Sequence, residues 1–143
     1  MELYLNQEHA ISVTDDETKK KWNYYIVTEP MWWAYAKAYA EIRNKRLATI
    51  PNLGLNVILA LELERLNLNK AWIGLNRKSS KNSWQWVSGK PFDENKFSNW
   101  AFGEPNNHWG HENWVMMYKD GKWNDLWNFK EGDKIPFIME DLW

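Results

Sequence analysis

The chain has 143 residues, a length that suits one domain, and its 18 basic and 19 acidic side chains leave a formal net charge of -1. The balance also holds along the chain, with nine basic and nine acidic residues before Ala71, so the sequence shows no basic excess of the kind that nucleic acids and anionic membranes require. A mean hydropathy of -0.72 argues against membrane insertion. The absence of cysteine excludes disulfides, cysteine-ligated zinc and thiol nucleophiles.

Residues 1–21 are polar and end in a charge run, from which we predict a solvated N-terminal arm before a folded domain over residues 22–143. Residues 24–27 have the β-branched and aromatic composition of a strand. Thr28 is expected to cap a following helix, because Pro30 suits a first turn and apolar residues then recur at helical steps. These recurring residues are Trp33, Ala36 and Ala40.

A second helix is predicted where another apolar stripe occurs, formed by Leu55, Ile58, Leu59, Leu63 and Leu66. After these residues the helical period ends. Short apolar runs between polar turns then predict strands at 72–75, 84–87, 114–118 and 137–140. Asp120-Gly121 is typical of a two-residue hairpin turn, whose central positions favour positive φ.

The stretch between Val87 and Trp114 has no clear period, and loops of this length in a compact domain are usually functional. Side chains with oxygen atoms gather in and after it, namely Glu104, Asn106, Glu112, Asn124 and Asp125. Carboxylate and amide oxygens from two segments suit Ca²⁺, which takes roughly six to eight oxygen ligands. On composition alone, ordinary turn residues on a polar surface are the alternative interpretation.

Tryptophan is unusually abundant, with twelve residues, eight of them between Trp72 and Trp127. Most are expected to fill the core, because each buried indole removes about 150 to 250 Å² of surface from water. Trp100, Trp114 and Trp123 are assigned to the core. A few tryptophans in this half of the chain are expected to face a ring-shaped ligand.

The order of the motifs decides between these interpretations. The chain contains Trp72-Ile73-Gly74-Leu75, Trp84-Gln85-Trp86, Trp100-Ala101-Phe102-Gly103-Glu104-Pro105-Asn106, Glu112-Asn113-Trp114-Val115, Gly121-Lys122-Trp123-Asn124-Asp125 and Phe137-Ile138-Met139-Glu140. In this order and at this spacing, the motifs resemble the C-type lectin domain over about residues 24–140. A lone Glu-Pro-Asn is weak evidence, whereas the whole series is specific.

The resemblance implies an α+β fold in which two helices flank small antiparallel sheets and a long loop binds calcium. By position, it assigns calcium binding to Glu104, Asn106, Glu112, Asn124 and Asp125. The first four of these side chains would also contact two neighbouring sugar hydroxyls. Trp109 and His108 would lie beside the sugar, although Trp109 is as readily interpreted as packing the loop and His108 as a solvated loop residue. Pro105 matches a proline that follows a cis bond in calcium-loaded relatives. A cis bond brings the side chains of Glu104 and Asn106 to one side of the chain.

The function that the resemblance implies is calcium-dependent glycan binding, outside the cell or at its surface, by a module that can belong to a larger protein. The N-terminus has no signal-peptide pattern, so an export signal is not expected within this sequence. Glu-Pro-Asn accompanies mannose- and glucose-type sugars in the family, those with equatorial 3,4-hydroxyls. The alternative is a C-type lectin-like module that binds protein without sugar, which usually follows loss of calcium ligands, and all five are present here.

The sequence departs from the family pattern in two places. A second calcium site would need acidic residues at four positions that here hold Arg77, Lys81, Asn107 and Asn113, so we predict that it is absent. The four usual cysteine positions fall near Ala40, Trp114, Asn128 and Met139. A cysteine-free domain of this kind favours a bacterial origin.

Two motifs invite an enzymatic interpretation. The segment from His108 to Glu112 contains two histidines and a carboxylate, but a zinc-protease motif needs both histidines on one helical face, and Pro105 and Gly110 argue against that helix. Glu104 and Glu112 could be a glycosidase acid and base, but a general acid must hold a proton, whereas a calcium ligand must stay ionised. We therefore predict a binding protein with calcium as its cofactor, and not an enzyme.

Overall fold

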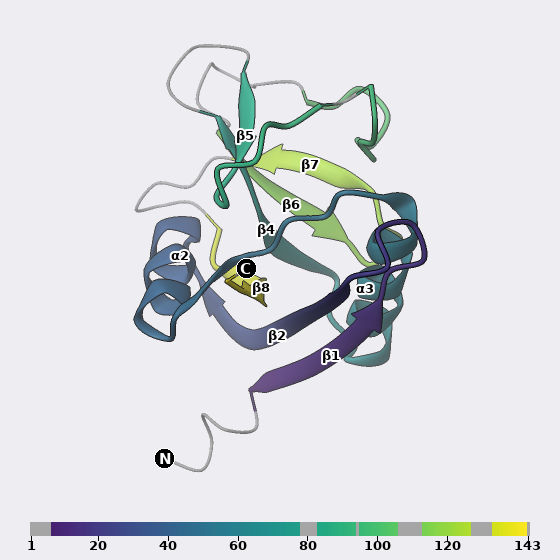
Figure 1. Ribbon diagram of the computed structural model, residues 1–143. Coiled ribbons are helices and arrows are strands. Elements are labelled where there is room, and N and C mark those ends of the chain that lie inside the picture. Colours follow the sequence, from purple (N-terminus) through teal and green to yellow (C-terminus); the bar gives the residue numbers. More distant parts are fainter. Residues whose placement is uncertain (1–6, 78–82, 94, 106–112, 127–132, 143) are drawn as a thin grey trace.

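The computed structural model describes residues 7–77, 83–93, 95–105, 113–126 and 133–142. Within these ranges the chain forms two helices and eight strands (Figure 1). The elements are β1 (Glu8–Thr14), β2 (Lys21–Met31), α2 (Trp33–Ile42), β3 (Lys45–Leu47), α3 (Leu53–Arg65), β4 (Lys70–Arg77), β5 (Trp84–Trp86), β6 (Trp114–Tyr118), β7 (Trp123–Leu126) and β8 (Ile135–Asp141).

The strands join in one mixed sheet with the order β1-β2-β8-β4-β6-β7, while β3 pairs with β8 and β5 with β4. All these pairings are antiparallel except that of β4 with β8, which meet in parallel at Trp72 and Phe137. The α+β prediction is confirmed. The small antiparallel sheets that we expected are continuous with one another, because the parallel contact between β4 and β8 links the two groups of strands.

Helices α2 and α3 lie on opposite sides of this sheet, and each covers its own apolar cluster (Figure 1). On α2 the predicted residues Trp33, Ala36 and Ala40 are buried in the cluster that includes Trp72 and Phe137. The opposite cluster receives Leu55, Leu59 and Leu63 from α3, with Trp86, Trp123 and Ile73 from the sheet and its loops. The helical periodicity therefore identified the buried faces correctly.

The predicted start of the first helix is wrong. Strand β2 continues through Thr28 and Pro30 to Met31, and α2 begins after Trp32, which makes no side-chain cap. The physical reason is sheet pairing: β2 pairs with β8 and resumes at Met31 after a shift in register. Backbone hydrogen bonds to a neighbouring strand outweigh the local preference of Thr28 for a cap, which is worth only about 1 kcal/mol.

Residues 8–14, which the sequence analysis assigns to a solvated arm, form the edge strand β1. Its register with β2 runs from Glu8 opposite Val27 to Thr14 opposite Lys21. The side chains of Ile11 and Val13 are partly buried against the core cluster. The sequence does not reveal this strand because its other side chains are polar or, at Ala10, small, as is common on an edge strand that faces water.

The hairpin between β6 and β7 lies where Asp120-Gly121 predicts it, but it has a three-residue loop. Tyr118 N–H donates to Lys122 O at 2.8 Å, and Gly121 N–H donates to Tyr118 O at 2.8 Å. In the described residues, positive φ occurs at Gly121 (90°) and not at Asp120. Asp120 instead accepts a hydrogen bond from Lys122 N–H at 2.9 Å through its side chain. This arrangement is the glycine bulge that commonly closes three-residue hairpin loops.

Candidate calcium and carbohydrate site

The segment that carries Glu104 runs beside strand β7, which carries the other described site residues. Trp100 and Trp123 form a parallel bridge between the two segments. Trp123 N–H donates to Asn99 O at 2.8 Å, and Ala101 N–H donates to Trp123 O at 2.8 Å. Backbone hydrogen bonds therefore bring together two parts of the predicted site that are well separated in the sequence.

A tight turn then places Glu104. Its N–H donates to Ala101 O at 2.9 Å, and Gly103 has a φ of 81°, a conformation that glycine adopts readily. The Glu104–Pro105 peptide bond is cis. This confirms the isomer that the family resemblance implies for Pro105.

Asn124 and Asp125 are neighbours on β7, and the side chains of both have buried oxygen atoms. The Asp125 side chain is fully buried. Asn124 Nδ2 donates to the hydroxyl of Tyr118 at 3.2 Å, while Asn124 Oδ1 is buried and accepts no hydrogen bond from any described residue. A buried amide oxygen without a donor normally costs about 1–3 kcal/mol, so such an atom requires an explanation.

The chemistry of these oxygen atoms suits a cation. Oε1 of Glu104 is buried as well, so the described part of the site combines two carboxylates with one carboxamide oxygen. Two carboxylates balance the charge of Ca²⁺, and the amide adds a neutral oxygen of the kind that this ion prefers. The described residues hold no group of three His, Cys, Asp or Glu close enough to bind a metal. The remaining predicted site residues, Asn106, His108, Trp109 and Glu112, lie outside the described residues.

A cluster of aromatic side chains, with one buried asparagine, packs against β7. Trp123 is fully buried and contacts the rings of four other aromatic residues, Trp86, Phe92, Phe97 and Trp100. Its indole Nε1 donates to Asn56 Oδ1 on α3 at 2.8 Å. The prediction that Trp123 belongs to the core is confirmed. Trp100 is half-buried against the same apolar cluster, and Trp114 is half-buried against the cluster on the other side of the sheet.

The second calcium site is predicted to be absent, and two of its four positions are described. Arg77 N–H donates to Asn113 O at 2.9 Å, and the guanidinium of Arg77 lies 4.6 Å from the centroid of the Trp84 ring. The other two positions, Lys81 and Asn107, lie outside the described residues. The absence of this site stays a prediction.

Sequence reasoning missed Phe102, which is fully exposed in the turn that leads to Glu104. An exposed phenylalanine differs from most aromatic side chains of this half, which pack in the core. The signal was present in the sequence, because Phe102-Gly103 occupies the central positions of a turn, and central turn positions point outward.

Comparison with known proteins places this geometry in a family. The family model of the Lectin C-type domain matches residues 29–130, more than half of the chain. The chain belongs to the C-type lectin domain family. Members of this family are binding modules and not enzymes, in agreement with the sequence prediction. Among the described residues, no helix is long and apolar enough to cross a membrane.

Several members of the family resemble the chain over most of its length. Human Collectin-10 is 30% identical over 109 residues, covering 76% of this chain and 38% of that protein. Chicken hepatic lectin is 31% identical over 104 residues, covering 73% of this chain and 48% of that protein. The chain thus spans less than half the length of these curated relatives.

Solved structures show the same fold. The bovine C-type carbohydrate-recognition domain of CD23, determined in the presence of a GlcNAc2Man3 oligosaccharide, has a TM-score of 0.72 and 31% identity, with 87% of this chain and 90% of that domain covered. The carbohydrate-recognition domain of the human scavenger receptor C-type lectin has a TM-score of 0.74 and 26% identity, with 94% and 97% covered.

Proposed function

We propose that this domain binds glycans through a calcium ion held by Glu104, Asn106, Glu112, Asn124 and Asp125, and that it prefers sugars with mannose- or glucose-type equatorial 3,4-hydroxyls. The observation that carries the proposal is the buried Oδ1 of Asn124, which accepts no hydrogen bond from the described residues. It lies on the strand beside the turn that presents Glu104, with the buried carboxylate of Asp125 next to it in the chain.

Family membership supports the general function. The relatives are named as lectins or receptors for glycoproteins, and the bovine CD23 domain was solved with a mannose-containing oligosaccharide. The chain retains all five residues of the ligand pattern that the family resemblance assigns. A module that had turned to protein partners alone would not need to keep this set.

The sugar preference follows from hydrogen-bond chemistry. An ionised Glu104 offers only acceptors, whereas Asn106 offers two N–H donors from its carboxamide. Each hydroxyl of an equatorial pair can donate to a carboxylate and accept from an amide while its oxygen also meets the ion. Exchanging the two side chains, as Glu104→Gln with Asn106→Asp, moves the donor across the site and favours the axial 4-hydroxyl of galactose. A buried mismatch costs about 1–3 kcal/mol, roughly five- to 150-fold in affinity.

The test is a competition assay in calcium and in chelator, with free mannose or galactose displacing the protein from a mannose-bearing support. We expect calcium-dependent binding with a monosaccharide dissociation constant near ~1 mM, since one sugar on an open site makes few contacts. Wild type should prefer mannose, and the exchanged double variant should shift toward galactose. Glu64→Gln with Asn67→Asp on and after α3 is the matched control, because it makes the same chemical exchange away from the site.

Two results would refute the proposal. The first is a preference of the wild type for galactose, or a sugar preference that is the same in the wild type and in the exchanged double variant. Either outcome means that Glu104 and Asn106 do not determine which sugar binds. Absence of any sugar binding with calcium favours the alternative, a protein-binding module of the same fold. The localisation outside the cell, the mannose-type partner and the place of residues 22–143 as the binding unit within a larger protein are parts of the same proposal.

A further inference from the structure

A hollow of about 290 Å³ opens beside the β1–β2 hairpin, and three of its four lining residues are lysines. Lys20 and Lys21 stand where the hairpin enters β2, Trp22 follows on β2, and Lys90 comes from the turn after β5. Nζ of Lys90 lies 5.9 Å from the centroid of the Trp22 ring. The three lysines are exposed, whereas Trp22 is buried beneath them.

Three acidic residues near this hollow have contacts outside it. Asp15 and Asp16 line a separate pocket against α3, and Asp15 accepts hydrogen bonds from Thr18 and Asn52. Glu140 is buried and accepts a hydrogen bond from Arg46 Nε at 2.7 Å. Lys20 and Lys21 form no ion pair with any residue in the described part of the chain.

The fold therefore holds positive charges close together. Burial and the charges of Lys20 and Arg46 lower the pKa of the Lys90 ammonium, against the opposing effect of the Glu140 carboxylate. Like charges at short range raise one another's electrostatic energy, and an anion placed among them relieves that energy. A concave, cationic surface of this kind suits a carboxylate or sulfate group.

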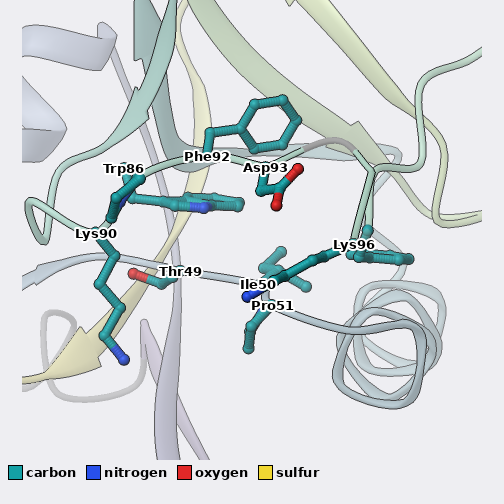
Figure 2. Close-up of a pocket in the computed structure, with 10 residues that line it drawn as sticks. Thr49, Ile50, Pro51, Trp86, Lys90, Phe92, Asp93 and Lys96 are labelled. Atoms are coloured by element: carbon teal, nitrogen blue, oxygen red, sulfur yellow. The ribbon is translucent and has the colours of Figure 1, made fainter.

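An adjoining pocket of about 100 Å³ shares Lys90 with the hollow (Figure 2). Figure 2 shows Lys90 and Lys96 at opposite ends, with Thr49, Ile50 and Pro51 on one side and, on the other, the Trp86 and Phe92 rings and the carboxylate of Asp93. This carboxylate can accept hydrogen bonds from sugar hydroxyls, whereas the acidic group of the ligand would meet the lysines of the hollow. Flat apolar side chains between cations match a saccharide, whose ring faces are apolar C–H surfaces and whose acidic substituents lie at intervals.

We propose that the hollow at Lys20, Lys21 and Lys90, together with the adjoining pocket, is a second saccharide site that binds acidic oligosaccharides through carboxylate or sulfate groups without calcium. The site shares no residue with the calcium site proposed above, so the two proposals can fail independently. The small number of cations and the chain's net charge of -1 favour an acidic saccharide over nucleic acid or an anionic membrane.

The test is calorimetric titration in low salt with a chelator present, so that no calcium is available to the site proposed above. The probes are a heparin tetrasaccharide, an oligogalacturonate tetrasaccharide that carries carboxylates alone, and neutral maltotetraose. We expect at least one acidic probe to bind and maltotetraose not to bind. The triple variant Lys20→Gln, Lys21→Gln, Lys90→Gln should weaken that binding at least tenfold, and the corresponding triple arginine variant should retain it. Binding of the heparin probe alone identifies sulfate as the group required, whereas binding of both acidic probes shows that a carboxylate is sufficient.

The matched control is Lys37→Gln, Lys119→Gln, Lys122→Gln, which changes the net charge equally but lies outside the hollow. Its affinity should stay within about twofold of wild type. An equal loss in this control, or no binding of either acidic probe, would overturn the site. Tighter binding of a DNA duplex or of phosphatidylserine vesicles, with the same dependence on the three lysines, would overturn the assignment to saccharides.

Discussion

Trp123 on β7 is tied to Asn56 on α3 by a hydrogen bond from the indole Nε1 to Asn56 Oδ1 at 2.8 Å, and both side chains are buried. The amide of Asn56 also donates to Gly121 O at 2.9 Å, in the hairpin that leads into β7. One carboxamide therefore connects α3 to the strand that carries Asn124 and Asp125.

Asn56→Ala should lower the free energy of unfolding by about 1–3 kcal/mol, because it leaves the buried indole N–H without an acceptor. Gly121 O keeps a hydrogen bond from Asn99 Nδ2, so it is not left unsatisfied. Urea unfolding followed by tryptophan fluorescence measures the change. Asn69→Ala, at an exposed position, is the control and should be near neutral. Equal effects of the two substitutions would show that the Asn56 contact contributes nothing specific.

Two glycines provide a matched pair with opposite expectations. A Cβ at Gly74 would lie 2.6 Å from Leu47 O and 2.7 Å from Ala48 O, both backbone atoms that cannot move aside easily. Gly74→Ala should therefore destabilise the fold by about 1–3 kcal/mol or more. A Cβ at Gly54, in the first turn of α3, would meet nothing closer than 3.5 Å. Gly54→Ala should be neutral or stabilise by up to about 1 kcal/mol, since alanine favours helix. Thermal unfolding compares both, and a loss at Gly54 matching that at Gly74 would contradict the steric argument.

The parts of the fold that were predictable from sequence are those in which local pattern and tertiary contact agree. The stripes from Trp33 to Ala40 and from Leu55 to Leu66 match helices whose buried faces contact the sheet, although Leu66 lies one residue past the end of α3. Residues 114–118 match β6. Prediction failed where a partner strand decides the conformation, as at Thr28, which continues β2. The candidate calcium ligands could be named from sequence because they fall within short motifs of fixed order. The cationic hollow was not, because Lys20 and Lys90 are distant in the sequence and meet only through the fold.

The buried carboxyl group of Glu140 predicts a pH dependence of stability. It accepts hydrogen bonds from Thr49 N–H, from Thr49 Oγ1 at 2.9 Å and from Arg46 Nε at 2.7 Å. Burial raises its pKa from 4.5 to about 7, although the hydrogen bonds from Thr49 and Arg46 oppose that rise. Between these two pH values the folded chain binds more protons than the unfolded chain, so the contribution of Glu140 to stability is complete below pH 4.5 and is lost as the pH rises toward 7.

Wild type should therefore lose stability relative to Glu140→Gln between these pH values, by on the order of 3 kcal/mol, because glutamine does not titrate. Only the difference in slope matters, since glutamine also changes the contact with Arg46 at every pH. Denaturant unfolding at several pH values gives both curves. Glu64→Gln, at an exposed position, should run parallel to wild type. Parallel curves for Glu140→Gln as well would mean that burial does not raise the pKa of Glu140.

Calcium should stabilise the folded domain through the oxygens that surround the proposed site. If the dissociation constant lies in the ~0.1 to 1 mM range, calcium at about 2 mM adds roughly 0.65 to 1.8 kcal/mol to the free energy of unfolding by mass action. Asn124→Ala and Asp125→Asn should each lose most of that increment, because each removes an oxygen or a charge from the site, whereas Asn69→Ala should keep it. Magnesium at the same concentration should have a smaller effect, because it demands a tighter octahedral set of ligands. Urea unfolding in calcium, magnesium and chelator measures the increment, and wild-type stability that is the same in all three would exclude calcium binding by these residues.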